Sequence, residues 1–356
     1  MEATVAAIEP GRLAGTAAAP PSKSAAHRAV VCAALAAGTS HIGNVEFSQD
    51  ILATLGAAQQ LGAKVERGEH ELTITGRGNA DGFATITRPV FCNESGSTLR
   101  FILPLFSLTA QKVRFTGAGR LMQRPQEIYA QLFERQGLRF EQNEQGITIF
   151  GRLCPGTFTL PGNVSSQFIS GLLFATPLME APSAIEVRAP FESRSYVDLT
   201  TDAMQKFGVK VSVRARKDGS ATYKVAAPQH YAAADMDVEG DYSQAAFLAV
   251  LGSTVGGITI TGLPSGSHQG DRVILDILKQ CGAKFERSGS HVTFHRSLLK
   301  AVEIDLADCP DLGPVLIALG CFCSGTTIIR TPGGCALKSV TALPLCRKSL
   351  PKWAAR

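Results

Sequence analysis

Two cations and two hydroxyl groups lie together at the start of an expected helix: Lys23, Arg28, Ser22 and Ser24. Two prolines before them favour an extended approach, and either serine can cap the alanine-rich helix expected from Ala25 to Ala37. Both cations then lie near free backbone N–H groups at the positive end of the helix dipole. Such an arrangement binds anions, most often a phosphate or a carboxylate. A capped surface helix with two solvated cations is the other interpretation.

Two glycine-containing turns further along the chain also gather groups that bind anions. The small residues around Gly96 lead into an apolar helix expected from Phe101 to Leu108, and they let backbone N–H groups approach a phosphate closely. The second turn carries Arg120 and Arg124, four residues apart and followed by a proline. Two guanidinium groups held in this way can clamp one carboxylate or phosphate. Solvated surface arginines and an ordinary turn are the alternatives.

Hydroxyl groups and one amide open two more expected helices. Ser165, Ser166 and Gln167 precede an apolar helix, and Ser193 and Tyr196 stand at the start of another. A helix cap explains one serine of the first group well, but it explains the glutamine poorly. The two groups therefore extend the series of polar helix starts.

One carboxylate, Asp311, lies shortly before an apolar helix expected from Val315 to Cys321. An acid at a helix start is usually a cap, but among cations it is placed to hold a hydroxyl group or to take its proton. Each cluster sits near an expected helix N-terminus, so the helices can aim their positive ends at one cleft. We expect that cleft to bind a small molecule with more than one anionic group.

A repeat organises these clusters. Four segments share a helix end, a glycine and then an alternating strand, and their glycines, spaced 71 to 75 residues apart, are Gly62, Gly137, Gly208 and Gly282. β-branched residues indicate a further series of strands around Ile42, Val113, Ile185, Ile258 and Ile328. The pattern predicts an α/β chain built of repeated βαβαββ units.

Composition sets limits on the class of protein. The 356 residues are 45% hydrophobic and 18% charged, which suits two domains of ordinary size. The net charge of +5 is mild, and no basic tract interleaved with aromatics points to nucleic acid. We find neither an apolar run of membrane-spanning length nor a secretory signal pattern. The nine cysteines lack metal-ligand spacing, which indicates thiols in a reducing cytosol.

In this order the motifs resemble the 5-enolpyruvylshikimate-3-phosphate synthase family, from about Pro20 to Ile329. The shared motifs are Ser-Lys-Ser-x-x-x-Arg, Gly-Ser-Thr-Leu-Arg, Gly-x-x-x-x-Arg-Pro, Ser-Ser-Gln, Ser-x-x-Tyr, Glu-Gly-Asp-Tyr-Ser and Pro-Asp-x-x-Pro. The resemblance implies an enolpyruvyl transferase-like inside-out α/β barrel, with two globular domains of three βαβαββ units each. The chain would cross twice between them.

The resemblance also implies a reaction. The 5-hydroxyl of shikimate 3-phosphate adds to C2 of phosphoenolpyruvate, and phosphate leaves from the tetrahedral intermediate. Asp311 would be the general base and Lys23 a proton-transfer group, without a metal or an organic cofactor. By motif, the substrate contacts would be Lys23, Ser24, Arg28, Gly96, Arg124, Ser165, Ser166, Gln167, Ser193, Tyr196 and Asp311. The enzyme would be a cytoplasmic monomer that binds neither nucleic acid nor a membrane.

The end of the chain departs from the family pattern. We expect a complete domain at residues 21–239, an incomplete one at 1–20 plus 240–330, and an aberrant tail at 331–356. Codons permitted for residues 336–356, read two nucleotides later, can encode a peptide similar to the family's Lys-Glu-Ser-Asp-Arg segment. We therefore hypothesise a frameshift followed by a premature stop. Coding DNA with no open frame that continues the family would contradict it.

Three functions remain open at this point. The first is the shikimate enzyme, with the chain as given expected to bind shikimate 3-phosphate weakly and to turn over little or not at all. The second is the related transferase that acts on UDP-N-acetylglucosamine, which carries a loop cysteine, whereas no cysteine lies between Cys92 and Cys154 here. The third is a truncated non-enzyme that only binds shikimate 3-phosphate.

Overall fold

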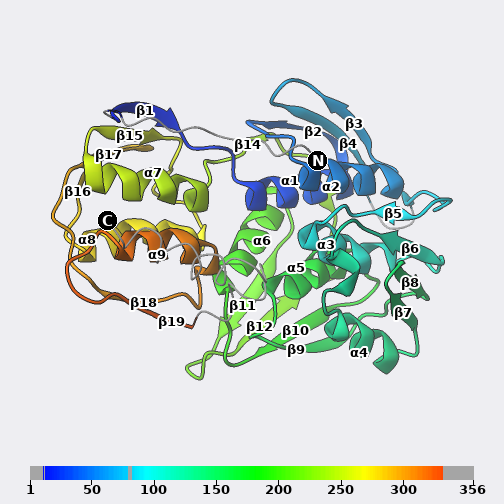
Figure 1. Cartoon of the computed structure of the whole chain (residues 1–356). Helices are drawn as coiled ribbons and strands as arrows, with labels where there is room; N and C mark the ends of the chain where they lie inside the picture. The colour runs from blue at the N-terminus through cyan, green and yellow to red at the C-terminus, as the bar shows by residue number, and fades with distance from the viewer. Residues whose placement is uncertain (1–10, 12, 79–81, 332–356) are drawn as a thin grey trace.

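The computed structural model describes residues 11, 13–78 and 82–331, and two groups of helices and sheets lie side by side in it (Figure 1). Each group has its own hydrophobic core. The core of the large lobe is formed by residues between Ala26 and Val238. The core of the small lobe combines Ala19 with residues between Tyr242 and Leu319.

Two units of the large lobe have their elements in the order β, α, β, α, β, β. The first holds β5 (Val90–Phe91), α3 (Gly96–Phe106), β6 (Val113–Thr116), α4 (Glu127–Arg135), β7 (Arg139–Asn143) and β8 (Gly146–Phe150). The second holds β9 (Thr157–Pro161), α5 (Ser166–Ala175), β10 (Ser183–Arg188), α6 (Arg194–Lys206), β11 (Val211–Ala215) and β12 (Ala221–Val225). Their sheets have the equivalent orders β5-β6-β8-β7 and β9-β10-β12-β11. The predicted βαβαββ repeat is confirmed.

The remaining unit of the large lobe takes its first strand from a distant part of the chain. It contains α1 (Lys23–Leu35), β2 (Ala36–Gly43), α2 (Gln49–Leu61), β3 (Lys64–Arg67) and β4 (Leu72–Arg77). The strands β13 (Tyr231–Ala232) and β14 (Met236–Asp237) pair in parallel with β2 and so complete its sheet. The unit thus joins residues nearly two hundred positions apart.

The small lobe repeats this arrangement. Its unit holds α7 (Tyr242–Val255), β15 (Ile258–Thr261), the 3-10 turn η4 (Gly270–Val273), α8 (Ile274–Gln280), β16 (Lys284–Ser288) and β17 (His291–His295). Here β1 (Gly15–Ala18) pairs in parallel with β15 as the first strand. A further unit begins with β18 (Glu303–Asp305), η5 (Pro310–Leu312), α9 (Gly313–Gly320) and β19 (Ile328–Arg330), and β18 and β19 pair in parallel.

The glycines that revealed the repeat follow helix ends. Gly62, Gly137, Gly208 and Gly282 all have positive φ angles, and each lies between a helix and the strand that follows it. Left-handed backbone is the usual way to end a helix, and glycine adopts it without a steric penalty. The five β-branched positions expected to mark strands lie in β2, β6, β10, β15 and β19.

The chain crosses between the lobes at two adjacent segments. Pro21 and Gly240 form an isolated antiparallel bridge. The Ser22 N–H donates to the Glu239 carbonyl at 2.8 Å, and the Asp241 N–H donates to the Pro20 carbonyl at 2.7 Å. The crossings therefore support each other, and α1 and α7 begin immediately beyond them.

Three helix boundaries differ from the expected ones. Helix α1 ends at Leu35 because Ala36 and Ala37 already belong to β2, so Gly38 lies within a strand. Helix α3 starts at Gly96 and ends at Phe106, and α9 covers Gly313–Gly320.

Among the described residues, no helix has the length and apolar character needed to cross a bilayer. The tail prediction, apart from Thr331, lies outside the described residues.

The close approach at the crossings gives a stability prediction. A Cβ atom on Gly240 would lie 2.5 Å from the Gly262 carbonyl oxygen and 2.8 Å from the Ala19 Cβ. We expect Gly240→Ala to lower the free energy of unfolding by about 1–3 kcal/mol, because backbone would have to move. Urea unfolding measures the effect. The control is Gly56→Ala in α2, where a Cβ has nothing within 4 Å. Equal stability of the two variants would contradict the packing described.

Candidate active site

A pocket of about 310 Å³ lies where α1, α3, α5 and α6 begin, and Asp311 of the small lobe also lines it. It brings together ten of the eleven residues expected to contact substrates: Lys23, Ser24, Arg28, Gly96, Arg124, Ser165, Ser166, Gln167, Tyr196 and Asp311. A second pocket of about 610 Å³ shares Lys23, Ser24 and Asp311 with it and reaches the start of α7. The two pockets together follow the junction between the lobes.

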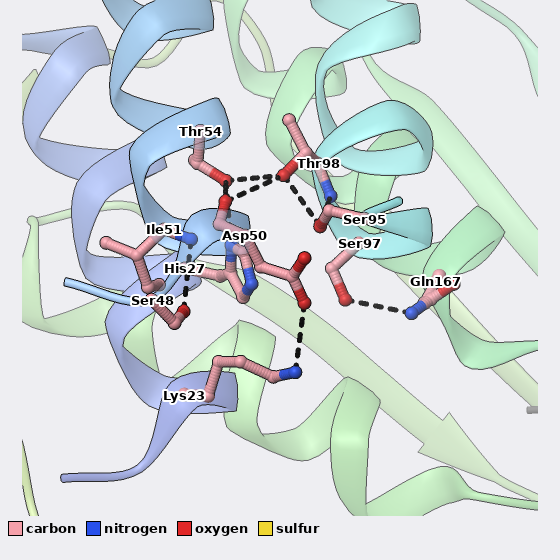
Figure 2. A network of polar contacts seen from close by, with 10 residues as sticks. All are labelled: Lys23, His27, Ser48, Asp50, Ile51, Thr54, Ser95, Ser97, Thr98 and Gln167. Atoms are coloured by element: carbon pink, nitrogen blue, oxygen red, sulfur yellow. Dashed lines mark hydrogen bonds and ion pairs between the residues drawn. The ribbon is translucent and has the colours of Figure 1, made fainter. Parts of the chain in front are cut away.

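Lys23 lies at the first position of α1 and extends into both pockets. Ser22 caps the helix by accepting from the Ala25 N–H at 3.4 Å. The Lys23 ammonium pairs with Asp50 of α2 at 3.0 Å, as Figure 2 shows. The lysine side chain is 55% exposed, so solvent screens the pair and it holds the ammonium only weakly. A ligand anion can therefore compete with Asp50 for Lys23.

A buried polar chain joins the first three helices behind the pocket (Figure 2). His27 Nδ1 lies 2.8 Å from the Thr54 hydroxyl, and Thr54 lies 2.7 Å from the Thr98 hydroxyl. Thr98 donates to the hydroxyl of Ser95, which caps α3. Burial lowers the pKa of His27 to about 3, with a smaller contribution from the nearby charge of Lys23. These side-chain hydrogen bonds thus connect the start of α3, where Gly96 faces the pocket, to α1 and α2.

Arg28 is almost fully buried, and its guanidinium is held by the protein itself. It donates to the Thr200 hydroxyl at 2.8 Å, to the Ser24 carbonyl at 2.6 Å and to the Tyr196 carbonyl at 2.7 Å. Its Cζ stands 5.1 Å from the centre of the Phe101 ring. Burial lowers its pKa to about 10, so it remains charged at neutral pH. The cation is fixed between α1 and α6 before any ligand arrives.

Arg100 is a second fixed cation, and it organises the side chains of α5. It donates to Gln167 Oε1 at 2.8 Å and to the Pro125 carbonyl at 3.1 Å, and its Cζ lies 4.5 Å from the Phe168 ring centre. Gln167 in turn donates to Ser97 at 2.9 Å. Burial lowers the pKa of Arg100 to about 10. The sequence prediction placed Arg100 in a motif but gave it no role in the site.

Arg124 reaches the pocket beside Gly96. Its Nη1 lies 3.2 Å from the position that a Cβ on Gly96 would take. Arg120, in contrast, is exposed and lines none of the pockets described, so the expected clamp of two arginines is wrong. The reason is local: a 3-10 turn over Leu121–Gln123 separates the two arginines. Arg124 therefore follows a turn and is not at a helix start.

The small lobe meets the pocket through Asp311. The Tyr196 hydroxyl of α6 lies 2.5 Å from Asp311 Oδ2 and 2.9 Å from Asp271 Oδ2. Burial, followed by the two neighbouring carboxylates, raises the pKa of Tyr196 well above its ordinary value. Tyr196 therefore stays protonated at neutral pH and can donate a hydrogen bond. It is the only one of these three groups that belongs to the large lobe.

Ser193 does not line the pocket with the other expected residues. Its backbone has a φ of 55°, and its N–H donates to the Ala307 carbonyl of the small lobe at 2.9 Å. Arg194 N–H donates to Asp308 Oδ1 at 3.1 Å. The backbone at the start of α6 is thus docked against the small lobe through the N–H groups of Ser193 and Arg194. The expected substrate contact of Ser193 stays a prediction.

Three acidic residues near the pocket were missed by the sequence prediction. Asp50 and Glu94 line it, and Asp271 contacts Tyr196 from below the surface. Each lies in or beside a helix start, where an acid is ordinarily a cap or a favourable partner of the helix dipole. Only its position in space distinguishes it: Asp50 pairs with Lys23, Asp271 contacts Tyr196, and Glu94 lines the pocket. The assembled pocket has four cations, two carboxylates and several helix N-termini on the large-lobe wall, and the Asp311 carboxylate on the other. It can bind a polyanion and accept a proton from it.

The comparisons with known proteins agree on one family. A family model described as EPSP synthase (3-phosphoshikimate 1-carboxyvinyltransferase) matches residues 8–341. A 3-phosphoshikimate 1-carboxyvinyltransferase of Clostridium kluyveri is 41% identical over 350 residues, which are 97% of this chain and 80% of that protein. Another, of Clostridium beijerinckii, is 37% identical over 356 residues, covering 98% of this chain and 81% of that protein.

Solved structures agree at the level of the fold. An EPSP synthase from Acinetobacter baumannii is similar with a TM-score of 0.72 at 22% identity, covering 90% of this chain and 74% of that one. The family match corrects one expectation. It extends to residue 341, so the predicted end of the resemblance near Ile329 is too early, and the chain spans about 80% of the length of these two relatives.

The buried histidine gives a pH prediction. Unfolding returns the pKa of His27 from about 3 to its ordinary 6.5, so below pH 6.5 the unfolded chain binds a proton that the folded chain does not. Folding stability should therefore fall with decreasing pH, by at most about 1.4 kcal/mol per pH unit from this group. We expect His27→Asn to flatten the curve of unfolding free energy between pH 6.5 and 4. Exposed His41→Asn is the control. Parallel curves for His27→Asn and the unsubstituted chain would contradict the account.

Proposed function

The chain belongs to the EPSP synthase family, and we propose that its cleft transfers the carboxyvinyl group of phosphoenolpyruvate to the 5-hydroxyl of shikimate 3-phosphate. The family's activity is that of a transferase, 3-phosphoshikimate 1-carboxyvinyltransferase. One observation supports its operation here above all others. The helix starts of the large lobe converge with Lys23, Arg28, Arg100 and Arg124 on one pocket, opposite Asp311. Two phosphorylated substrates need such a concentration of positive charge.

Shikimate 3-phosphate fits the wall formed by α5 and α6. We assign its phosphate to the start of α5, where Ser165 and Ser166 offer hydroxyl and backbone donors and Gln167 adds an amide. Tyr196 and the docked Ser193 stand at the start of α6, with Tyr196 facing the pocket. Ser193, which the small lobe holds, would act by fixing this turn. The acceptor hydroxyl would then point to the small lobe.

Phosphoenolpyruvate fits the wall formed by α1 and α3. Gly96 lets the start of α3 come close to an anion, and Arg124 Nη1 is its immediate neighbour. Lys23 and Ser24 lie between this wall and the second pocket, and Arg28 adds a fixed charge beneath them. Negative charge that develops on the transferring group would be stabilised by these preorganised donors. Lys23 would also exchange a proton with C3 of phosphoenolpyruvate.

The proton transfers follow from this placement. Asp311 takes the proton of the 5-hydroxyl as its oxygen bonds to C2 of phosphoenolpyruvate, while C3 gains a proton. The C2–O bond to phosphate then breaks, C3 gives a proton back to Lys23 as the double bond re-forms, and the proton held by Asp311 leaves with the phosphate. The product keeps the carboxyvinyl group, and inorganic phosphate leaves. Exclusion of water by the two lobes would protect the intermediate.

The same proposal includes the organisation and setting of the protein. We infer one domain at residues 21–239 and another at 1–20 plus 240–330, because the separate cores and the paired crossings coincide with these limits. We infer a cytoplasmic monomer that acts in the shikimate pathway, towards chorismate and the aromatic amino acids. The absence of cysteine between Cys92 and Cys154 favours this reaction over the UDP-N-acetylglucosamine reaction.

A phosphate-release assay tests the proposal. We expect release that requires both phosphoenolpyruvate and shikimate 3-phosphate, and a fall in kcat of at least about a hundredfold in Asp311→Asn, which keeps the shape but not the base. Exposed Asp276→Asn, on α8, is the matched control. Binding of shikimate 3-phosphate without any release would favour the binding-only alternative and contradict the proposal.

A further inference from the structure

We propose that Asp271 is a positioning residue for the reaction: through the Tyr196 hydroxyl it holds the Asp311 carboxylate in place at the cleft. This inference rests on the proposed function of Asp311 as the base. Asp271 stands at the start of the small-lobe turn η4, and Asp311 stands in η5. No substrate contact is assigned to Asp271.

The contact geometry links the three groups in a row. The single Tyr196 hydroxyl lies 2.9 Å from Asp271 Oδ2 and 2.5 Å from Asp311 Oδ2. A phenol has one proton, so both contacts are hydrogen bonds only when a second proton is shared within the group. The short contact to Asp311 is typical of a charge-assisted bond. Removal of either carboxylate therefore changes the hydrogen bond between the Tyr196 hydroxyl and the remaining carboxylate.

Asp271 is rigidly placed. The neighbouring Gln269 is buried, accepts from the Tyr242 N–H at 3.0 Å and donates to the Glu239 side chain at 2.7 Å and the Gly240 carbonyl at 2.8 Å. Gly270 lies so close to α6 that a Cβ on it would be 2.2 Å from the Ser195 hydroxyl. The turn that carries Asp271 is thus anchored to the lobe crossing and pressed against the start of α6.

Asp271 acts indirectly, as its position relative to the pockets indicates. Tyr196 and Asp311 line the 310 Å³ pocket, whereas Asp271 lines neither this pocket nor the 610 Å³ pocket beside it. Its side chain is 4% exposed. Asp271 lines only a space of about 10 Å³ beside Tyr196 and Asp311, which has room for about one water molecule and none for a substrate. The carboxylate is therefore a support for the other two groups.

A double-mutant cycle tests this inference on the full chain. We expect Asp271→Ala to lower kcat by about tenfold or more, with KM for phosphoenolpyruvate unchanged within about twofold, since contacting residues in one network are coupled. Asp271→Asn, whose amide can bond the same hydroxyl, should restore kcat to within about threefold. In a Tyr196→Phe background, Asp271→Ala should change kcat by less than about twofold. Asp276→Asn should leave kcat unchanged.

Two results would overturn the inference. The first is a folded Asp271→Asn variant whose kcat is as low as that of Asp271→Ala. The second is a fall in kcat on Asp271→Ala that is equally large with Tyr196 and with Tyr196→Phe. Urea midpoints check folding, and Asp271→Leu, which fills a similar volume, replaces Asp271→Ala in the cycle if that variant is unfolded. Failure of the proposed function itself is seen earlier, as no substrate-dependent phosphate release by the unsubstituted chain. The cycle is then measured on the dissociation constant of shikimate 3-phosphate, with the same expected pattern.

Discussion

The paired crossings between the lobes are the constraint on which the rest of the structure depends. The N-terminal strand β1 pairs with β15 of the small lobe, and β14, which comes late in the chain, pairs with β2 of the large lobe. The chain must therefore pass between the lobes twice, and the two passages lie together where Pro21 and Gly240 form a bridge. Helices α1 and α7 begin directly after these crossings. Lys23 and Ser24 are therefore held at the lobe junction by backbone hydrogen bonds. The site lies at this junction because the topology allows no other position for the start of α1.

Electrostatics then distinguishes the cations from one another. Arg28 is buried and Arg100 is half-buried, and both bond to carbonyl and side-chain oxygens, so they supply a fixed field and hold the helices together. Lys23 is exposed and only weakly paired with Asp50, so it can respond to a ligand. A polyanion entering the pocket meets both kinds of charge. The fixed charges need little reorganisation, which is what stabilises a developing negative charge best.

The sequence predicted the repeat and most of the residues that line the pocket because both depend on local signals. Glycines after helix ends and polar residues at helix starts have strong backbone preferences, so Gly62 and Ser22 behaved as expected. The end of α1 was misplaced because alanine suits a helix, while pairing with β4 and β13 draws Ala36 and Ala37 into a strand. Asp271 gave no signal of its own. Its relation to Tyr196 arises only from packing across the lobes.

The central claim is that the converging helix starts of the large lobe and Asp311 of the small lobe form one substrate site. A crystal structure of the full chain with shikimate 3-phosphate tests it most directly. We predict that the ligand lies in the 310 Å³ pocket, with its phosphate at the start of α5 and its 5-hydroxyl within hydrogen-bonding distance of Asp311. A ligand bound elsewhere, or one in this pocket with its 5-hydroxyl turned away from the small lobe, would contradict the account.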